Sequence, residues 1–228
     1  ILWLSINMDR LNFIASLSSG AKILCDIGCD HAYALEIALT KYNVDRGLAC
    51  DVNEGPLACA KRNIITKGLE DRVDFILSDG FKNVNSNFDT AIISGMGGIL
   101  ITNILLSSIN KIKDKTLILS PNTDVNLVRK FLSTHNFEII EEYAIIEQGK
   151  YYEIIKAIPG NCKLTPFEIE FGPILLKNRP EAFIKNIEKK YNQFRSIIDN
   201  IKNEEEKNNI RNKLISYKEV LNGKGIYK

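Results

Sequence analysis

The sequence lacks the cysteine and histidine patterns of disulfide-bonded and metal-binding proteins. Its 228 residues contain five cysteines, an odd number, with no CxxC pair, and they contain two histidines. Because the cysteines are scattered among apolar residues, a disulfide framework is disfavoured and the reducing environment of the cytoplasm is favoured. We also expect no bound metal, since no second cluster of Cys or His accompanies Cys25 and Cys29.

Long apolar runs, internal repeats and low-complexity tracts are absent as well. No hydrophobic stretch approaches the length needed to cross a bilayer, so we expect no association with a membrane. A hydrophobic content of 45% and a charged content of 25% are ordinary for a globular protein. The chain is long enough for one α/β domain and a smaller appendage.

The charge is distributed unevenly along the chain, although its net value is +2. Residues 1–175 contain 17 Lys and Arg against 21 Asp and Glu, a balance of −4, whereas residues 176–228 contain 13 against 7, a balance of +6. A basic C-terminal part is typical of a segment that binds a polyanion. A solvated, charged helical surface explains this pattern equally well.

Short apolar runs alternate with segments of helical periodicity between residues 8 and 158. Continuous runs of this kind are typical of strands buried on both faces of a parallel sheet. The predicted strands are Lys22–Asp26, Arg46–Asp51, Val73–Leu77, Thr90–Ser94 and Thr116–Ser120, and the predicted helices are Tyr33–Tyr42, Gly55–Lys67, Gly98–Asn110 and Asp124–His135. The alternation predicts an α/β fold with helices on both faces of the sheet.

The sheet is predicted to end in a different way. Phe137–Ile146 and Tyr151–Ala157 are strand-like, and Glu147–Lys150 between them is too short for a crossover helix. These two strands therefore form an antiparallel hairpin. A mostly parallel sheet with an antiparallel C-terminal hairpin is typical of the Rossmann-like class I methyltransferases.

A capping pattern at Thr165, Pro166 and Glu168 predicts that the following segment is helical. Apolar residues then recur in steps of three and four over 184–201 and 210–221, with a charged break at Lys202–Asn209. This spacing predicts an antiparallel coiled-coil hairpin. We therefore divide the chain into a Rossmann-like methyltransferase domain (1–160) and a C-terminal helical coiled-coil domain (161–228).

The turn after the first predicted strand differs from a dinucleotide fingerprint. Asp30 stands where GxGxxG has its second glycine, and Asp26 and Asp30 together would repel a pyrophosphate. A carboxylate at the strand end, followed by Gly28, suits a cofactor with a cationic amino-acid tail, because Asp26 can pair with an ammonium group. Asp30 could also cap the next helix. His31 either contacts the amino-acid end of the cofactor or hydrogen-bonds within the loop.

Acids follow the next two strands as well. Asp51, which precedes Val52, lies about 25 residues after the first motif, where a carboxylate accepts hydrogen bonds from both hydroxyls of a ribose. Asp79, which precedes Gly80, would lie beside an adenine ring and near the line of methyl transfer. Asp-Gly is also ordinary turn chemistry.

Glycines and an amide follow the fourth and fifth strands. Gly95 and the Met96-Gly97-Gly98 segment would leave an open groove for a planar base, with Met96 packed against it. A close crossing of helix and strand would also require glycine. Asn122 offers both a donor and an acceptor at the same edge of the sheet.

In this order the motifs resemble the bacterial tRNA (adenine-22-N1)-methyltransferase family, TrmK. The segments that carry the resemblance are Asp26–Tyr33, Glu54–Leu57 with Ala60–Lys61, Asp79–Gly80, Gly95–Gly98, Ser120–Asn122, Gly149–Glu153 and Phe171–Pro173. They are spread over almost the whole chain, and DHAY, GMGG and FGP are distinctive in combination. Two positions depart from the family, since Asp51 stands where Glu is common and Ser120 where Gln is common.

The resemblance implies an S-adenosylmethionine-dependent enzyme that methylates N1 of adenine 22 in tRNA. With the strand-end motifs, it assigns catalytic roles to Asp79, Met96 and Asn122. The expected cofactor-binding residues are Asp26, Gly28, Asp30, His31, Asp51, Val52, Asp79, Gly80, Gly95 and Met96. The basic helices would hold the phosphate backbone of tRNA through Lys185, Lys189, Lys190 and Arg195.

Two alternatives remain open from the residues alone. The first is a methyltransferase that acts on another RNA site, a protein or a small molecule, with the basic helices used for a partner or for dimerisation. The second is a non-catalytic RNA-binding protein with a vestigial pocket, which the acids at three strand ends disfavour. No obligate protein partner is predicted.

Overall fold

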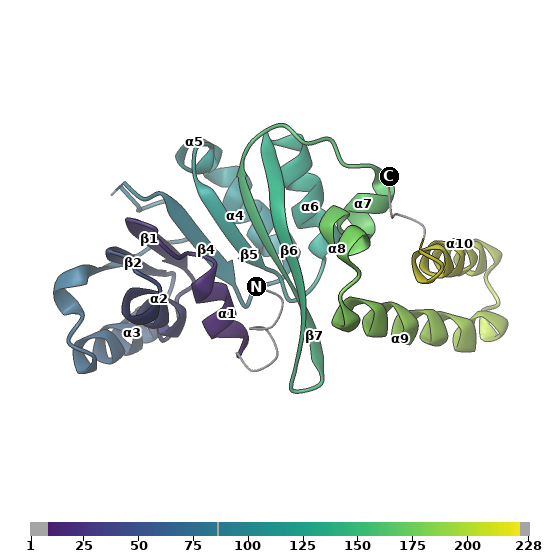
Figure 1. Ribbon diagram of the computed structural model, residues 1–228, viewed down its shortest axis with the longest axis horizontal. Coiled ribbons are helices and arrows are strands. Elements are labelled where there is room, and N and C mark those ends of the chain that lie inside the picture. The colour runs from purple at the N-terminus through teal and green to yellow at the C-terminus, as the bar shows by residue number, and fades with distance from the viewer. Residues whose placement is uncertain (1–8, 86, 224–228) are drawn as a thin grey trace.

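A seven-stranded sheet forms the centre of the molecule in the computed structural model, which describes residues 9–85 and 87–223 (Figure 1). The strands are β1 (Ile23–Ile27), β2 (Arg46–Asp51), β3 (Val73–Leu77), β4 (Thr90–Ser94), β5 (Thr116–Ser120), β6 (Phe137–Glu147) and β7 (Lys150–Pro159). Their order is β3-β2-β1-β4-β5-β7-β6, with β1 to β5 parallel and β7 antiparallel to both β5 and β6. The predicted Rossmann-like sheet and its C-terminal hairpin are confirmed.

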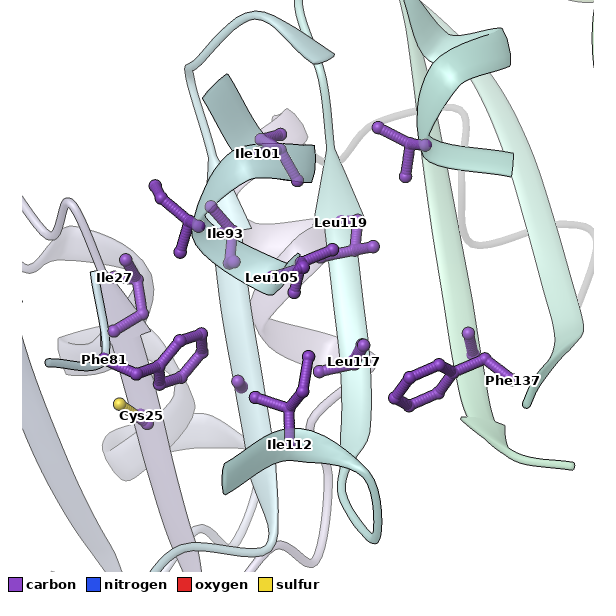
Figure 2. Close-up of a cluster of buried hydrophobic side chains, with 14 of the residues drawn as sticks. Cys25, Ile27, Phe81, Ile93, Ile101, Leu105, Ile112, Leu117, Leu119 and Phe137 are labelled. Atoms are coloured by element: carbon purple, nitrogen blue, oxygen red, sulfur yellow. The ribbon is translucent and has the colours of Figure 1, made fainter. Parts of the chain in front are cut away.

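Helices cover both faces of this sheet, which explains why the central parallel strands β1, β4 and β5 are mostly apolar and buried. The helices of the sheet domain are α1 (Arg10–Ser16), α2 (Tyr33–Lys41), α3 (Glu54–Thr66), α4 (Gly98–Ser107), α5 (Ile109–Ile112) and α6 (Val125–Thr134), with a 3-10 turn η2 (Glu70–Arg72) before β3. Alternate strand residues such as Leu24 and Ile92 pack with α1, α2 and α3. Their neighbours, such as Ile93 and Leu119, pack with α4, α5 and α6 (Figure 2).

Two features of the helices differ from the sequence prediction. Helix α1 was not predicted; it begins after Asp9, whose carboxylate accepts a hydrogen bond from the Asn12 amide at 2.7 Å. The single helix predicted over 98–110 is divided at Ser108 into α4 and α5. Helix α1 packs against the β6–β7 hairpin, where the rings of Phe13 and Tyr143 lie 4.7 Å apart.

The C-terminal helices lie beside the β6–β7 hairpin (Figure 1). They are α7 (Pro166–Phe171), α8 (Pro173–Asn178), α9 (Glu181–Ile197), the 3-10 turn η3 (Ile198–Asn200) and α10 (Glu204–Leu221). The predicted capping box of Thr165 and Glu168 is present. Arg179, just before α9, donates to the carbonyl of Val220 near the end of α10 at 2.6 Å. The two long helices therefore run antiparallel, as the predicted hairpin requires.

The charged break predicted at Lys202–Asn209 is too long. Helix α10 already begins at Glu204, and the side chain of Asn203 accepts a hydrogen bond from the amide of Glu206 at 3.0 Å. Three successive glutamates form the first turn, where negative charge is favoured by the helix dipole. The charges that indicated a loop therefore belong to a helix start.

A buried ion cluster joins the sheet domain to the C-terminal helices. Arg129 of α6 donates through Nε to Glu142 of β6 at 2.7 Å and pairs with Glu153 of β7, and the side chains of Arg129 and Glu142 are fully buried. The guanidinium also donates to the carbonyl of Glu170 at 3.3 Å, and Glu142 accepts from the Ile174 amide at 2.8 Å. The cluster thus attaches α7 and α8 to the β6–β7 hairpin.

The domain boundary predicted at residue 160 falls in the coil between β7 and α7, and it stays a prediction.

Within the described ranges 9–85 and 87–223, no helix has both the length and the apolar character needed to cross a membrane.

We predict that Gly172→Ala destabilises the fold, because Gly172 lies between α7 and α8 at φ +86° and ψ 124°. A Cβ at this position would lie 2.6 Å from Nη2 of Arg129 and 2.7 Å from Oε2 of Glu142. Backbone strain and displacement of buried charge should together lower the free energy of unfolding by about 3 kcal/mol or more, measured in urea. The control is Gly20→Ala, at φ +80° with no atom within 4 Å of the added Cβ. Equal losses in the two variants would show that the cluster tolerates the side chain.

Candidate functional site

A cavity of about 500 Å³ lies at the carboxyl ends of β1 to β4. All ten residues expected to bind a cofactor line it, namely Asp26, Gly28, Asp30, His31, Asp51, Val52, Asp79, Gly80, Gly95 and Met96. They come from four loops that are far apart in the sequence. Parallel strands bring those loops together because their carboxyl ends meet at one edge of the sheet.

The loop after β1 is held close to β2. The amides of Gly28 and Cys29 both donate to the carbonyl of Cys50, at 2.8 and 3.0 Å. Gly28 adopts φ +71°, and a Cβ there would lie 2.1 Å from Cε of Met96. The positive φ favours glycine here, whereas the Met96 methyl group is the end of a flexible side chain and can move away from an added Cβ.

Asp30 and Asp51 have different surroundings in this loop region. The predicted capping role of Asp30 is wrong, because the N-cap of α2 is Ala32 and no side chain caps it. Asp51 accepts hydrogen bonds from the amide of Asp30 at 3.3 Å and from the amide of Asn53 at 2.9 Å. These contacts fix the orientation of the Asp51 carboxylate at the wall of the cavity.

Asp26 is buried at the base of the cavity, with 4% of its surface exposed. Burial, and then the negative charge of Asp51, raise the pKa of Asp26 to about 7. Burial disfavours the charged form of a carboxyl group. A cationic ligand group beside Asp26 would offset that cost and lower the pKa again.

Asn122 lies outside this cavity but holds part of its wall. Its side-chain amide donates to the carbonyl of Gly95 at 2.8 Å, and its backbone amide donates to the carbonyl of Met96 at 2.8 Å. The close crossing of helix and strand is present at Gly98, whereas the groove for a base stays a prediction. Gly95 lines the cavity and has open space around it, whereas a Cβ on Gly98 would lie 2.3 Å from the carbonyl oxygen of Asp124.

Asp79 is at the open side of the cavity. Its side chain is 58% exposed, and it pairs with Lys82 at 2.5 Å. The following Gly80 adopts φ +59° and lies against Ile104. The turn expected of Asp-Gly is therefore present, and Asp79 is among the residues that line the cavity.

Arg10 is a cavity residue that the sequence analysis missed. Its guanidinium lies over the ring of Tyr152, 4.4 Å from the centroid, and Nη1 donates to Oγ of Ser120 at 3.4 Å. Its Nε is buried without a hydrogen-bond partner and lies 3.6 Å from Oε2 of Glu147. No strand-end motif pointed to Arg10, because it belongs to a helix that was not predicted.

The four basic residues expected to bind tRNA are exposed on α9. At 3.6 residues per turn, Lys185 and Lys189 share one side of the helix, while Lys190 and Arg195 point in other directions. Lys185 pairs with Glu181 at 2.5 Å, and Lys190 lines a second cavity between the sheet and the C-terminal helices. The role of these residues in tRNA binding stays a prediction.

Across residues 9–85 and 87–223 there is no group of three or more His, Cys, Asp or Glu side chains placed to hold a metal ion.

Comparison with known proteins supports a single family. The model of the family TrmK, tRNA (adenine(22)-N(1))-methyltransferase, matches residues 24–220. The tRNA (adenine(22)-N(1))-methyltransferase of Bacillus subtilis is 30% identical over 200 residues, which are 84% of either chain.

Solved structures agree with this match. Sp1610 of Streptococcus pneumoniae, solved in complex with S-adenosyl-L-methionine, has a TM-score of 0.86 and 32% identity, covering 93% of this chain and 98% of that one. TrmK of M. capricolum, solved with S-adenosyl-homocysteine, has a TM-score of 0.87 and 29% identity, covering 95% of this chain and 98% of that one.

We predict that Asp26 makes the ligand-free protein less stable as pH rises. The folded protein keeps the Asp26 proton up to about pH 7, whereas the unfolded chain loses it near the ordinary value of 3.8. Between these values the folded state binds more protons, so its stability falls with rising pH. Relative to Asp26→Asn, the wild type should lose roughly 3 kcal/mol of unfolding free energy between pH 5 and pH 8.

Urea unfolding at the two pH values measures this difference. Asp30→Asn is the matched control, because the side chain of Asp30 is 70% exposed. A pH dependence that is unchanged in Asp26→Asn would show that the carboxyl group of Asp26 titrates normally.

Proposed function

The chain belongs to the TrmK family of tRNA (adenine(22)-N(1))-methyltransferases, and we propose how its own residues perform that reaction. It is an S-adenosylmethionine-dependent enzyme that methylates N1 of adenine 22 in tRNA. The observation that supports the assignment of residues is the cavity at the carboxyl edge, where acids from three strand ends meet one arginine. Its natural setting is the cytoplasm.

The cavity fits the charges of S-adenosylmethionine. The ammonium of the methionine tail pairs with Asp26, whose buried carboxyl group then ionises. The ribose hydroxyls donate to Asp51, whose carboxylate is already oriented by the amides of Asp30 and Asn53. Asp79 and Val52 border the adenine.

Arg10 binds the carboxylate of the methionine tail. Among the described residues that line the cavity, Arg10 is the one Lys or Arg, and its Nε is buried without a hydrogen-bond partner. A carboxylate accepts strong hydrogen bonds from a guanidinium and would satisfy this donor. Asp26 and Arg10 would therefore hold the two charged groups of the cofactor tail, with His31 and Gly28 in the same wall of the cavity.

When bound, the cofactor supplies an electrophilic methyl group on its sulfonium. The residues of the chain contribute mainly by placing N1 of the adenine in line with that group, since the N1 lone pair attacks directly and no covalent intermediate is needed. Met96 packs against the base, and Asn122 positions Met96 and Gly95 through hydrogen bonds to their carbonyls. The carboxylate of Asp79 stabilises the positive charge that develops on the adenine or takes a proton from N6.

Adenine N1 is hidden in a base pair, so the base leaves its stack before reaction. The cations Lys185, Lys189, Lys190 and Arg195 contact the phosphates of the tRNA, which makes binding weaker at higher salt.

Methyl transfer is expected to depend on adenine at position 22. Unmodified tRNA transcripts that differ only in adenine or guanine at this position are incubated with labelled S-adenosylmethionine and digested to nucleosides. Label should appear as N1-methyladenosine in the adenine transcript alone. Label in both transcripts would assign another site, and label in neither, with the cofactor bound, would refute the substrate.

Arg10→Gln is expected to weaken binding of S-adenosylhomocysteine about tenfold to a hundredfold in calorimetry, because one charge-assisted contact is lost. Binding of methylthioadenosine, which lacks the amino-acid tail, should not change. Arg46→Gln is the control, since the Arg46 side chain is 49% exposed and lies outside the cavity. If Arg10→Gln instead raises KM for tRNA and leaves the affinities for S-adenosylhomocysteine and methylthioadenosine unchanged, Arg10 contacts the tRNA and not the cofactor tail.

A further inference from the structure

The second cavity, of about 380 Å³, lies between the sheet domain and the C-terminal helices. Its walls are the loop 121–126 after β5, the start of β7, helix α7, and the facing sides of α9 and α10. It is therefore open at the same edge of the sheet as the cofactor cavity. None of the residues expected from the sequence to bind the cofactor lines it.

Asn122 forms the boundary between the two cavities. Its side chain lines the second cavity, while its hydrogen bonds hold the carbonyls of Gly95 and Met96, which line the first. A nucleotide strand that delivered one base to Met96 would then place a neighbouring nucleotide near Asn122. This proximity follows from the contacts and does not depend on the role of any single charged residue.

The walls of the second cavity are suited to a nucleobase and unsuited to a phosphate. Asp124, Glu153 and Glu170 are among the residues that line it, and Lys190 is the one cation among its described residues. Negative charge repels a phosphate, whereas carboxylates accept hydrogen bonds from the N–H groups of a base edge. Apolar side chains of Phe183 and Ile187 form the opposite wall.

The clearest indication that the second cavity binds a ligand comes from the hydroxyl group of Tyr151. This hydroxyl is buried and makes no hydrogen bond of good geometry in the described part of the chain. Burial raises the pKa of the phenol, and so does the carboxylate of Glu153, which lies close to it and is itself paired with Arg129. Leaving a buried hydroxyl unpaired costs about 1–3 kcal/mol. A base with a polar edge in the cavity would satisfy it.

We propose that this cavity binds the nucleobase next to adenine 22 in the tRNA chain, unstacked from its neighbours and recognised through Tyr151 and the carboxylates. Lys190, exposed at the rim, contacts the phosphate of the same nucleotide. The inference rests on the proposed function, because it takes tRNA as the substrate. It adds a second base-binding site to the one that holds the reacting adenine.

A double-mutant cycle between protein and RNA tests the proposal. Wild type and Tyr151→Phe are each assayed with intact tRNA and with tRNA made abasic at position 21 or at position 23. With intact tRNA, Tyr151→Phe should raise KM about tenfold, which corresponds to about 1.4 kcal/mol. Binding of S-adenosylhomocysteine should not change. With one of the two abasic tRNAs, wild type and variant should have the same KM, because the partner of the hydroxyl is gone.

Tyr143→Phe is the matched control, since it removes a phenol hydroxyl from the same hairpin that is already bonded to Glu141. It should leave KM for every tRNA unchanged. The proposal is overturned if Tyr151→Phe raises KM equally for intact tRNA and for both abasic tRNAs, or if it leaves KM unchanged for all of them. Absence of methyl transfer by the wild type to intact tRNA would instead refute the proposed function.

Discussion

The buried contact between Arg129, Glu142 and Glu153 determines where the C-terminal helices lie relative to the catalytic edge. Burying a guanidinium is tolerated here because two carboxylates and two backbone carbonyls surround it. Glu142 in the same cluster also accepts a hydrogen bond from the amide of Ile174, which fixes the start of α8 to β6. Because Glu153 also lines the second cavity, the position of that cavity beside the cofactor site follows from this one ionic contact.

Electrostatics distinguish the two cavities. The first places Asp26 in a buried position that disfavours its own ionisation, which suits a ligand with a positive charge. The second has carboxylates of its own, but Glu153 is already compensated by Arg129. The polar groups of the second cavity can therefore accept hydrogen bonds from a ligand, and the ligand needs less positive charge to balance them. A charged cofactor tail and a neutral base are accordingly favoured in different places.

The strands, and the residues that line the first cavity, could be predicted because their signals are local. A continuous apolar run that ends in an acid specifies both a buried strand and a group at its carboxyl edge, as at Asp26 and Asp51. Arg10 and the Arg129 cluster could not be predicted this way. Their partners lie far along the chain, as between Arg10 and Glu147, so only the packed fold brings them together. The glutamates at the start of α10 led to the prediction of a loop that is too long, because a charged run is typical of both a loop and a helix N-terminus.

The catalytic role predicted for Asn122 stays a prediction, but its contacts show what this residue holds in place. An amide at a strand end suggested direct participation in the reaction, yet both of its hydrogen bonds are to the backbone of Gly95 and Met96. Methyl transfer to a lone pair gains most from alignment, so a group that fixes the backbone beside the base contributes through geometry. The same side chain faces the second cavity. A nucleotide bound there would therefore contact the residue that holds the backbone beside the reacting base.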